Sequence, residues 1–143
     1  MIISTKGRYA LRVILDLAEN GNESYIPMKV VAERQGLSLK YLEHILPILA
    51  QHHIVQGVHG KGGGYRLTRS PEEYSVGEIL RLVEGDLAPV ACLECGAKPC
   101  ERADQCRTVS MWKTLQNMID RYLDSVTIKD LMCGEVEGSC TVK

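Results

Sequence analysis

The feature that most constrains the fold is a glycine-rich segment set between two short apolar runs. Residues 59–64 read His-Gly-Lys-Gly-Gly-Gly, and the flanking runs 54–58 and 65–67 have the length and residue types of strands. Four glycines allow the backbone to turn tightly and to approach a neighbour closely. The segment therefore predicts a two-stranded hairpin with a basic tip inside an otherwise helical chain.

Three helices are predicted before this hairpin. The ranges 4–20, 27–35 and 39–52 carry apolar residues at helical spacing. Gly36 permits a sharp turn between the second and third helices. Pro47 lies inside the third helix, where it removes one backbone hydrogen bond and should cause a kink.

Residues that favour helix starts support these boundaries and two later ones. Short polar side chains that can accept the first orphan amide N–H groups occur at Ser4 or Thr5, Ser38, Ser75 and Thr127. Pro27 suits a first helical position because its backbone angle is fixed. Ser75 with Glu78 predicts a capping box, and Gly85 should end that helix. The pattern indicates further helices after Ser75 and Thr127.

One more helix carries a heptad-like seam in the C-terminal half. Its apolar residues recur in steps of three and four, as in a coiled coil, at Trp112, Leu115, Ile119, Tyr122 and Val126. A seam of this kind favours pairing with a second helix, so we expect it to form a dimer interface.

The near-neutral composition conceals two halves of opposite charge. Residues 1–70 carry nine Lys/Arg against five Asp/Glu, together with all four histidines. Residues 71–143 carry eight Lys/Arg against thirteen Asp/Glu, together with all six cysteines. A net charge of −1 would argue against nucleic acid as a partner, but the basic N-terminal half restores that option.

The order helix, glycine turn, helix and glycine-rich hairpin is that of a winged helix-turn-helix. We therefore predict a mostly α fold with a small β-wing. In such a fold the second helix of the pair can enter a major groove about 12 Å wide with its N-terminal residues on the base edges. The wing and the first helix can contact phosphates or the minor groove. The candidate DNA-binding residues are Lys6, Arg8, Ser38, Lys40, Tyr41, Glu43, His59, Lys61 and Arg66.

Each part of this pattern has a simpler explanation when taken alone. Paired short helices with a glycine turn are common packing units, and a glycine-rich hairpin is a weak signal. The glycine-rich segment also lacks the G-x-x-x-x-G-K-[ST] spacing of a nucleotide-binding loop. No histidine and carboxylate arrangement suggests a catalytic site, so we expect no enzyme.

Four of the six cysteines are clustered in the second half, with the spacing Cys92-x2-Cys95-x4-Cys100-x5-Cys106. Thiolates are ligands for iron–sulfur clusters, zinc and copper(I), and a short loop can wrap several of them around one centre. The spacing does not separate a cluster from a tetrahedral zinc site. Oxidation to a disulfide and unliganded surface thiols are further alternatives. Cys133 and Cys140 lack ligand-like neighbours.

Four stretches of the sequence resemble the Rrf2 family of bacterial transcriptional regulators, most closely its IscR-type members. They read STKGRYALRVILDLA, ERQGLSLKYLEHIL, VHGKGGGYRL and SVGEILRLVEG, and the resemblance extends from Ile3 to Leu131. It implies a homodimer, a winged helix-turn-helix, and a long C-terminal helix that crosses to the partner. It also implies a three-cysteine iron–sulfur motif at Cys95, Cys100 and Cys106.

The chain departs from that family pattern at the fourth cluster ligand. The first interval of the motif is one residue shorter, and Val109 stands where IscR-type members have a liganding histidine. Other members take a ligand from the partner's first helix, where this chain has Arg8 and Arg12. Cys92 is therefore the predicted fourth ligand. His59 replaces an arginine of the wing, which could make DNA binding pH-sensitive.

These observations predict four segments in the chain. They are a winged helix-turn-helix DNA-binding domain at 1–85, a cysteine-rich cluster loop at 86–107, a dimerisation helix with a short following helix at 108–132, and a flexible tail at 133–143. Charges in the first residues argue against a signal peptide, and no apolar run is long enough to span a membrane, so we expect a cytoplasmic protein.

The predicted function is transcriptional regulation, with operator affinity controlled by a [2Fe–2S] or [4Fe–4S] cluster that responds to redox state, iron or nitric oxide. The expected partners are a palindromic double-stranded DNA operator and a second copy of the chain, with RNA polymerase or a regulatory protein as further candidates. The alternative is the same fold with structural zinc, or with sensing through a partner protein and no cluster.

Overall fold

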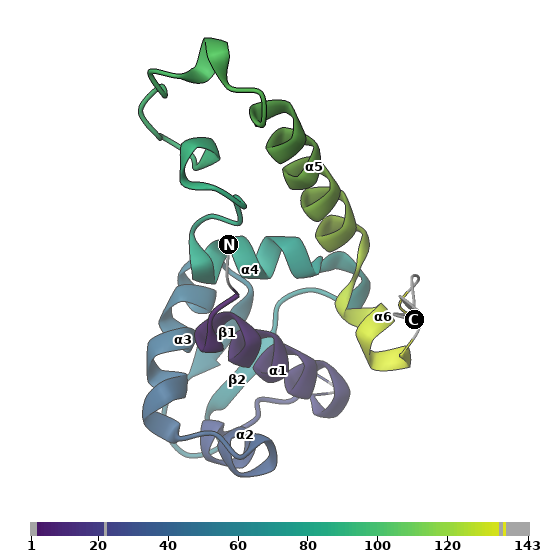
Figure 1. Cartoon of the computed structure of the whole chain (residues 1–143). Coiled ribbons are helices and arrows are strands. Elements are labelled where there is room, and N and C mark those ends of the chain that lie inside the picture. Colours follow the sequence, from purple (N-terminus) through teal and green to yellow (C-terminus); the bar gives the residue numbers. More distant parts are fainter. Residues whose placement is uncertain (1–2, 22, 135, 137–143) are drawn as a thin grey trace.

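The computed structural model of the chain describes residues 3–21, 23–134 and 136. Within them no helix is both long enough and apolar enough to cross a bilayer. The described residues form six α-helices and one two-stranded sheet, and one long helix projects from the body that the others make up (Figure 1). The predicted mostly α fold with a small β-wing is confirmed.

The N-terminal helices and the hairpin follow the predicted order. They are α1 (Thr5–Asn20), α2 (Met28–Gln35), α3 (Leu39–Gln51), β1 (Val55–Val58) and β2 (Gly64–Leu67). β1 and β2 pair antiparallel, with Val55 opposite Leu67 and Val58 opposite Gly64. Gly64 must lack a side chain because a Cβ there would lie 2.2 Å from the carbonyl oxygen of Ile26. The hairpin therefore packs its base against the segment that leads into α2.

After the hairpin, the chain forms three more α-helices, with a long loop between the first two. A short 3-10 turn, η1 (Pro71–Glu73), leads into α4 (Val76–Glu84). The loop from residue 86 to residue 107, here called the cysteine loop, contains only the short 3-10 turns η2 (Ala91–Leu93) and η3 (Ala103–Gln105). It joins α5 (Val109–Ser125), which is followed by α6 (Ile128–Cys133).

Most of the predicted caps form, and one is different. The Ser4 and Ser38 hydroxyl oxygens accept from the N–H groups of Gly7 and Tyr41, and Thr127 forms a full capping box with Asp130. The capping box predicted at Ser75 is only half formed. Ser75 accepts from the Glu78 N–H, but the Glu78 carboxylate pairs with Arg69 at 2.7 Å instead of returning to Ser75.

Of two further sequence expectations, the one for Pro27 is corrected and the one for Gly36 is confirmed. Pro27 precedes α2 as its N-cap and is not its first residue. Gly36 adopts the left-handed conformation, with φ of 63°, that the predicted sharp turn requires. The flexible tail predicted at 133–143 falls mostly on residues 135 and 137–143, which lie outside the described residues, as does Cys140.

The larger of two hydrophobic clusters in the described residues unites α1, α2, α3, α4, α6 and the sheet. Its fully buried members include Ile14, Leu42, Ile45, Ile79 and Ile128. Tyr74 is also buried, and its hydroxyl donates to the carbonyl of Ile54 and accepts from the N–H groups of Thr68 and Arg69. This residue therefore ties the end of the wing to the start of α4.

Candidate functional site

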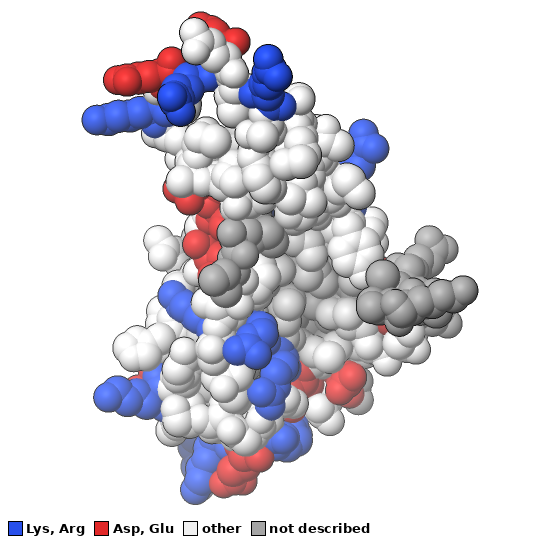
Figure 2. Space-filling view, in the orientation of Figure 1, with Lys and Arg blue, Asp and Glu red and all other residues white. Residues whose placement is uncertain are grey.

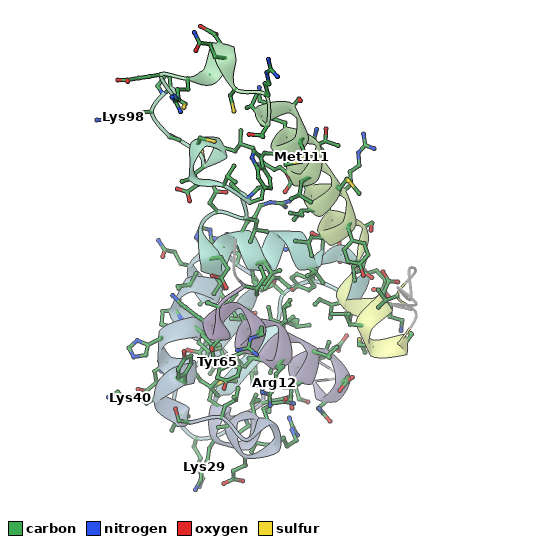
Figure 3. All side chains as sticks on the ribbon, in the orientation of Figure 1. Arg12, Lys29, Lys40, Tyr65, Lys98 and Met111 are labelled. Carbon is green, nitrogen blue, oxygen red and sulfur yellow. The ribbon has the colours of Figure 1, made fainter. Side chains whose placement is uncertain are left out.

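The N-terminal end of α3 presents the predicted base-reading residues to solvent. Lys40, Glu43 and His44 are exposed, and Tyr41 is 38% exposed. Ser38 lies at the start of the helix, where its oxygen caps the N–H of Tyr41. Figure 3 shows Lys40 pointing away from the body. This end of α3 is therefore free to enter a groove.

Contacts with α1 and α2 fix the pose of this end of α3. The Tyr41 ring packs edge-on against Tyr9 of α1 at a centroid distance of 5.2 Å. Arg12 lies 5.4 Å from the Tyr9 ring and donates to the side chain and the carbonyl of Gln35, at the end of α2. The Tyr41 ring thus contacts α1 directly and is linked to the end of α2 through Tyr9 and Arg12.

A buried carboxylate secures the turn between α2 and α3. Asp16 of α1 is 2% exposed and accepts from Arg34 Nε and Nη2 at 3.1 and 2.5 Å and from Gln35 Nε2 at 2.9 Å. Arg34 and Gln35 are the last two residues of α2. The sequence patterns did not reveal this anchor, because an isolated Asp in an amphipathic helix carries no local signal of burial.

The predicted DNA-binding residues of the wing differ in whether their side chains already have partners. His59 and Lys61 are exposed at the tip and form no hydrogen bond or ion pair within the described residues. Arg66 instead donates to Gln56 Oε1 and to the carbonyl of Glu23, and its guanidinium lies 4.6 Å from the Tyr25 ring. Arg66 therefore supports the hairpin, while the tip residues are available to a ligand.

The predicted cations on α1 lie near the start of that helix. Arg8 is exposed and donates to Thr5, and Lys6 is half-buried. Figure 2 shows Lys and Arg over the lower part of the molecule, which Figure 1 identifies with α1, α2, α3 and the wing, and a second group of charged residues of both signs at the top, around the cysteine loop.

The four clustered cysteines lie on a solvent-facing loop at the opposite end. Cys92, Cys95 and Cys100 are exposed, Cys106 is half-buried, and all four are free thiols. The base of the loop is fixed by Asp86, whose carboxylate accepts from the N–H groups of Cys95 and Ala88 at 2.6 Å each. Hydrogen bonds from these N–H groups, chiefly that of Cys95, lower the pKa of Asp86.

Cys106 differs electrostatically from a fully solvated thiol. Its sulfur lies 3.4 Å from the Thr108 hydroxyl, immediately before α5. That hydroxyl and the following backbone N–H groups stabilise the thiolate and lower the pKa of Cys106. The thiolate is the form that binds a metal.

The donor chemistry of the loop suits an iron–sulfur cluster or zinc, since it supplies four thiols from one short segment. Its conformation does not gather them: among the described residues, no three His, Cys, Asp or Glu side chains lie together as metal ligands would. The cysteine loop is therefore not a preformed site, and binding four thiolates to one centre would require it to fold further.

α5 carries an exposed apolar face that continues away from the body. Four large side chains lie along it, with exposures of 52, 38, 63 and 48%: Met111, Leu115, Met118 and Tyr122. Figure 2 shows little charge on this part of the surface. A hollow on the face is lined by Met111, Trp112, Leu115 and Met118.

Two members of the predicted seam lie elsewhere. Ile119 is half-buried, and Val126 lies beyond the end of α5, 7% exposed against Val76, Leu80 and Leu87. Val126 therefore belongs to this subunit's own core and does not share the exposed face. The sequence interpretation missed Met111 and Met118, which a seam shifted by one residue would have included.

Comparisons with known proteins agree with this arrangement. The sequence profile of the Rrf2 family, described as an iron-dependent transcriptional regulator, matches residues 3–134. The HTH-type transcriptional regulator IscR of Sodalis glossinidius is 34% identical over 94% of this chain and 81% of its own length. IscR of Escherichia coli is 33% identical over 92% of this chain and 80% of its own length.

Solved structures show the same similarity. CymR, described as the global cysteine regulator of B. subtilis, superposes with a TM-score of 0.76 and 33% identity, covering 94% of this chain and 98% of that protein. IscR of T. potens superposes with a TM-score of 0.73 and 34% identity, covering 94% of this chain and 88% of that protein.

Proposed function

The chain belongs to the Rrf2 family and is an IscR-like, DNA-binding transcriptional regulator, and from this premise we propose that the cysteine loop binds an iron–sulfur cluster that controls operator affinity. The observation that carries the proposal is the set of four free thiols on one solvent-facing loop between α4 and α5. The description of the family as iron-dependent favours iron over zinc as the metal.

The residues of the chain have distinct roles in this proposal. Cys92, Cys95, Cys100 and Cys106 would hold the cluster, which supplies redox and iron-exchange chemistry when bound. Asp86 holds the loop through the main chain of Cys95, so the anchor does not compete for the thiols. The loop ends lead directly into α4 and α5, so further folding of the loop would act on both helices.

Metal analysis of anaerobically purified protein tests the cofactor. We expect a coloured protein with iron and sulfide bound, and little zinc. The Cys92→Ser variant should lose iron and change its absorption spectrum, whereas Cys133→Ser, which removes an exposed thiol of α6, should match the wild type. A colourless protein with stoichiometric zinc would contradict the cluster, and an unchanged Cys92→Ser variant would contradict the fourth ligand.

DNA contact is assigned to one continuous end of the molecule. The N-terminal end of α3, with Ser38, Lys40, Tyr41 and Glu43, would face base edges in the major groove. His59 and Lys61 at the wing tip and Lys6 and Arg8 on α1 would contact phosphates or the minor groove. Arg66 would act indirectly, because its guanidinium is already engaged within the hairpin.

The proposed dimer forms through the exposed face of α5. Met111, Leu115, Met118 and Tyr122 recur in steps of four, three and four, as in the seam of a coiled coil. A second copy of the same helix would bury these side chains and fill the hollow beside Trp112. Two winged helices joined in this way would read a palindromic operator.

A further inference from the structure

The direction in which α5 leaves the body depends on its contacts with α4. The C-terminal end of α5 is held by a hydrogen bond of 2.8 Å from the Val76 N–H to the Val126 carbonyl, and Val126 is buried beside Leu80. Its N-terminal half projects beyond α4 toward the cysteine loop (Figure 1). The C-terminal end of α5 is therefore fixed, and the angle between α4 and α5 determines where its projecting half lies.

Arg81 of α4 binds two carboxylates that lie one turn apart on α5. Its Nη1 is 2.6 Å from Asp124 Oδ1, and its Nη2 is 3.2 Å from Asp124 Oδ2 and 2.8 Å from Asp120 Oδ1. The planar guanidinium fixes the direction of such a contact as well as its length. The hydrogen bonds that Arg81 donates to Asp124 and Asp120 raise its pKa, so the clamp stays charged.

Gly77, one turn earlier on α4, provides the room for this clamp. A Cβ at this position would lie 2.1 Å from Asp124 Oδ1 and 2.9 Å from Arg81 Nη1. Glycine favours a helix less than alanine does. The chain thus has a poor helix former at the point where a methyl group would collide with the ion pair.

The clamp is poorly suited to a role in stability. The side chains of Arg81, Asp120 and Asp124 are 36, 37 and 50% exposed, and ion pairs in contact with water contribute little to folding. The three hydrogen bonds of Arg81 and the close approach at Gly77 instead define the angle between the two helices.

We propose that Arg81, Asp120 and Asp124, packed over Gly77, fix the angle between α4 and α5 and thereby set the separation of operator half-sites that the dimer accepts. This inference rests on the proposed dimerisation through α5. In such a dimer each winged helix is attached to the shared α5 pair through its own α4. A change in the α4–α5 angle therefore moves one α3 relative to the other.

The scale of this movement is sufficient. An α-helix of 17 residues is about 25 Å long, so a rotation of about 10° at one end displaces the other by about 4 Å. Successive base pairs are about 3.4 Å apart along the duplex. A modest change of angle thus corresponds to a shift of about one base pair in the preferred half-site spacing.

The test measures half-site spacing. A palindromic duplex selected by the wild-type protein from a random library is rebuilt with its half-sites moved together or apart by one base pair at a time. Affinity for each duplex is measured for the wild type, Arg81→Met, Gly77→Ala and a control, Arg121→Met. Arg121 is an exposed arginine of α5 that forms no ion pair within the described residues.

We expect both clamp variants to remain dimeric, to bind the wild-type spacing roughly tenfold more weakly, and to shift or broaden their spacing preference. Arg121→Met should keep the wild-type preference despite the same loss of charge. If both clamp variants show the wild-type dependence of affinity on half-site spacing, the inference is wrong. If Arg81→Met does not fold, the spacing profile of Gly77→Ala, which retains every charge, is the test. A wild-type protein that is monomeric, or that binds no palindrome, would refute the proposed dimeric function itself and this inference with it.

Discussion

Asp16 shows how a single buried residue can position α3, the helix proposed to read DNA. It is buried in α1, yet its three hydrogen bonds reach the last two residues of α2, directly before the Gly36 turn into α3. A carboxylate without partners would be costly to bury, and here each oxygen accepts at least one hydrogen bond. The orientation of α3 therefore depends on a side chain two helices away.

Replacing this carboxylate should weaken both the fold and DNA binding. We expect Asp16→Ala to lower the free energy of unfolding by roughly 1–3 kcal/mol, toward the lower end because its partner Arg34 is 37% exposed. Urea unfolding measures this change, and an operator titration should show weakened binding in conditions where the variant is folded. Glu19→Ala, an exposed change on the same helix, should alter neither; an equal loss in both variants would contradict the role of Asp16.

Asp130 gives a pH dependence whose sign follows from its capping role. The Thr127 N–H donates to its carboxylate at 2.8 Å, and this bond, with the Thr127 hydroxyl, lowers the pKa of Asp130 in the folded chain. Its contribution to stability is therefore complete above the unfolded value, near 3.9, and is lost as the pH falls through the lower folded pKa.

Urea unfolding measured between pH 7 and pH 2.5 should show this contribution disappearing below about pH 4. Asp130→Ala should reduce the acid-dependent loss of stability relative to the wild type. Glu72→Ala removes an exposed carboxylate that accepts no hydrogen bond within the described residues, and it should leave the acid-dependent loss unchanged. Identical acid dependence in wild type and Asp130→Ala would count against the cap.

Residues were predictable where their partners are close in sequence. Ser4, Ser38 and Thr127 cap helices because the amide groups they satisfy lie three residues on. Glu78 escaped prediction because Arg69, nine residues earlier, is a stronger partner for its carboxylate than the Ser75 N–H. The Asp16 anchor and the Arg81 clamp join residues 18 to 43 positions apart, a distance at which local patterns carry no signal.

At the scale of elements, α5 stands out because it carries large apolar side chains that its own subunit does not cover. Met118 is 63% exposed and Met111 52%, both more than the predicted seam residues Leu115 and Tyr122. Helical period alone identified the element. The exact face could not be read from the sequence because Val126, at similar spacing, packs into the core and Ile119 is half-buried.

A charge placed on this face should separate the proposed dimer. Met118→Glu would put two like charges near each other in a paired α5 interface, so we expect a monomer in sedimentation or light scattering. Its affinity for a palindromic operator should fall steeply because the two half-sites are no longer bound together. Lys113→Glu, an exposed change on the same helix, should remain dimeric, and a dimeric Met118→Glu variant would refute this interface.

On the scale of the whole molecule, the cations of α2 and α3 and the thiols of the cysteine loop occupy opposite ends. Lys29 and Lys40 point outward at one end, and Lys98 of the cysteine loop points outward at the other (Figure 3). The split of charge along the sequence predicted two functional halves. It did not predict the conformation of the cysteine loop, because spacing specifies which thiols can share a centre but not how the loop folds without one.

Salt dependence should report which end contacts DNA. Release of counterions makes the logarithm of affinity fall linearly with the logarithm of salt concentration. Lys61→Ala should lower the magnitude of this slope by about 1, since it removes one phosphate contact. Lys98→Ala removes the same charge from the cysteine loop and should keep the wild-type slope. A changed slope in Lys98→Ala and an unchanged one in Lys61→Ala would contradict DNA contact at the wing.

The anchoring of the cysteine loop by Asp86 has a consequence for how such regulators diversify. Asp86 holds the main chain of Cys95 and Ala88, so the anchor is indifferent to which side chains the loop carries. The thiols, their spacing and the loop length can therefore change by substitution, insertion or deletion while the winged helix keeps its core. A loop with another set of ligands, grafted between α4 and α5, would make the same DNA-binding domain respond to a different signal.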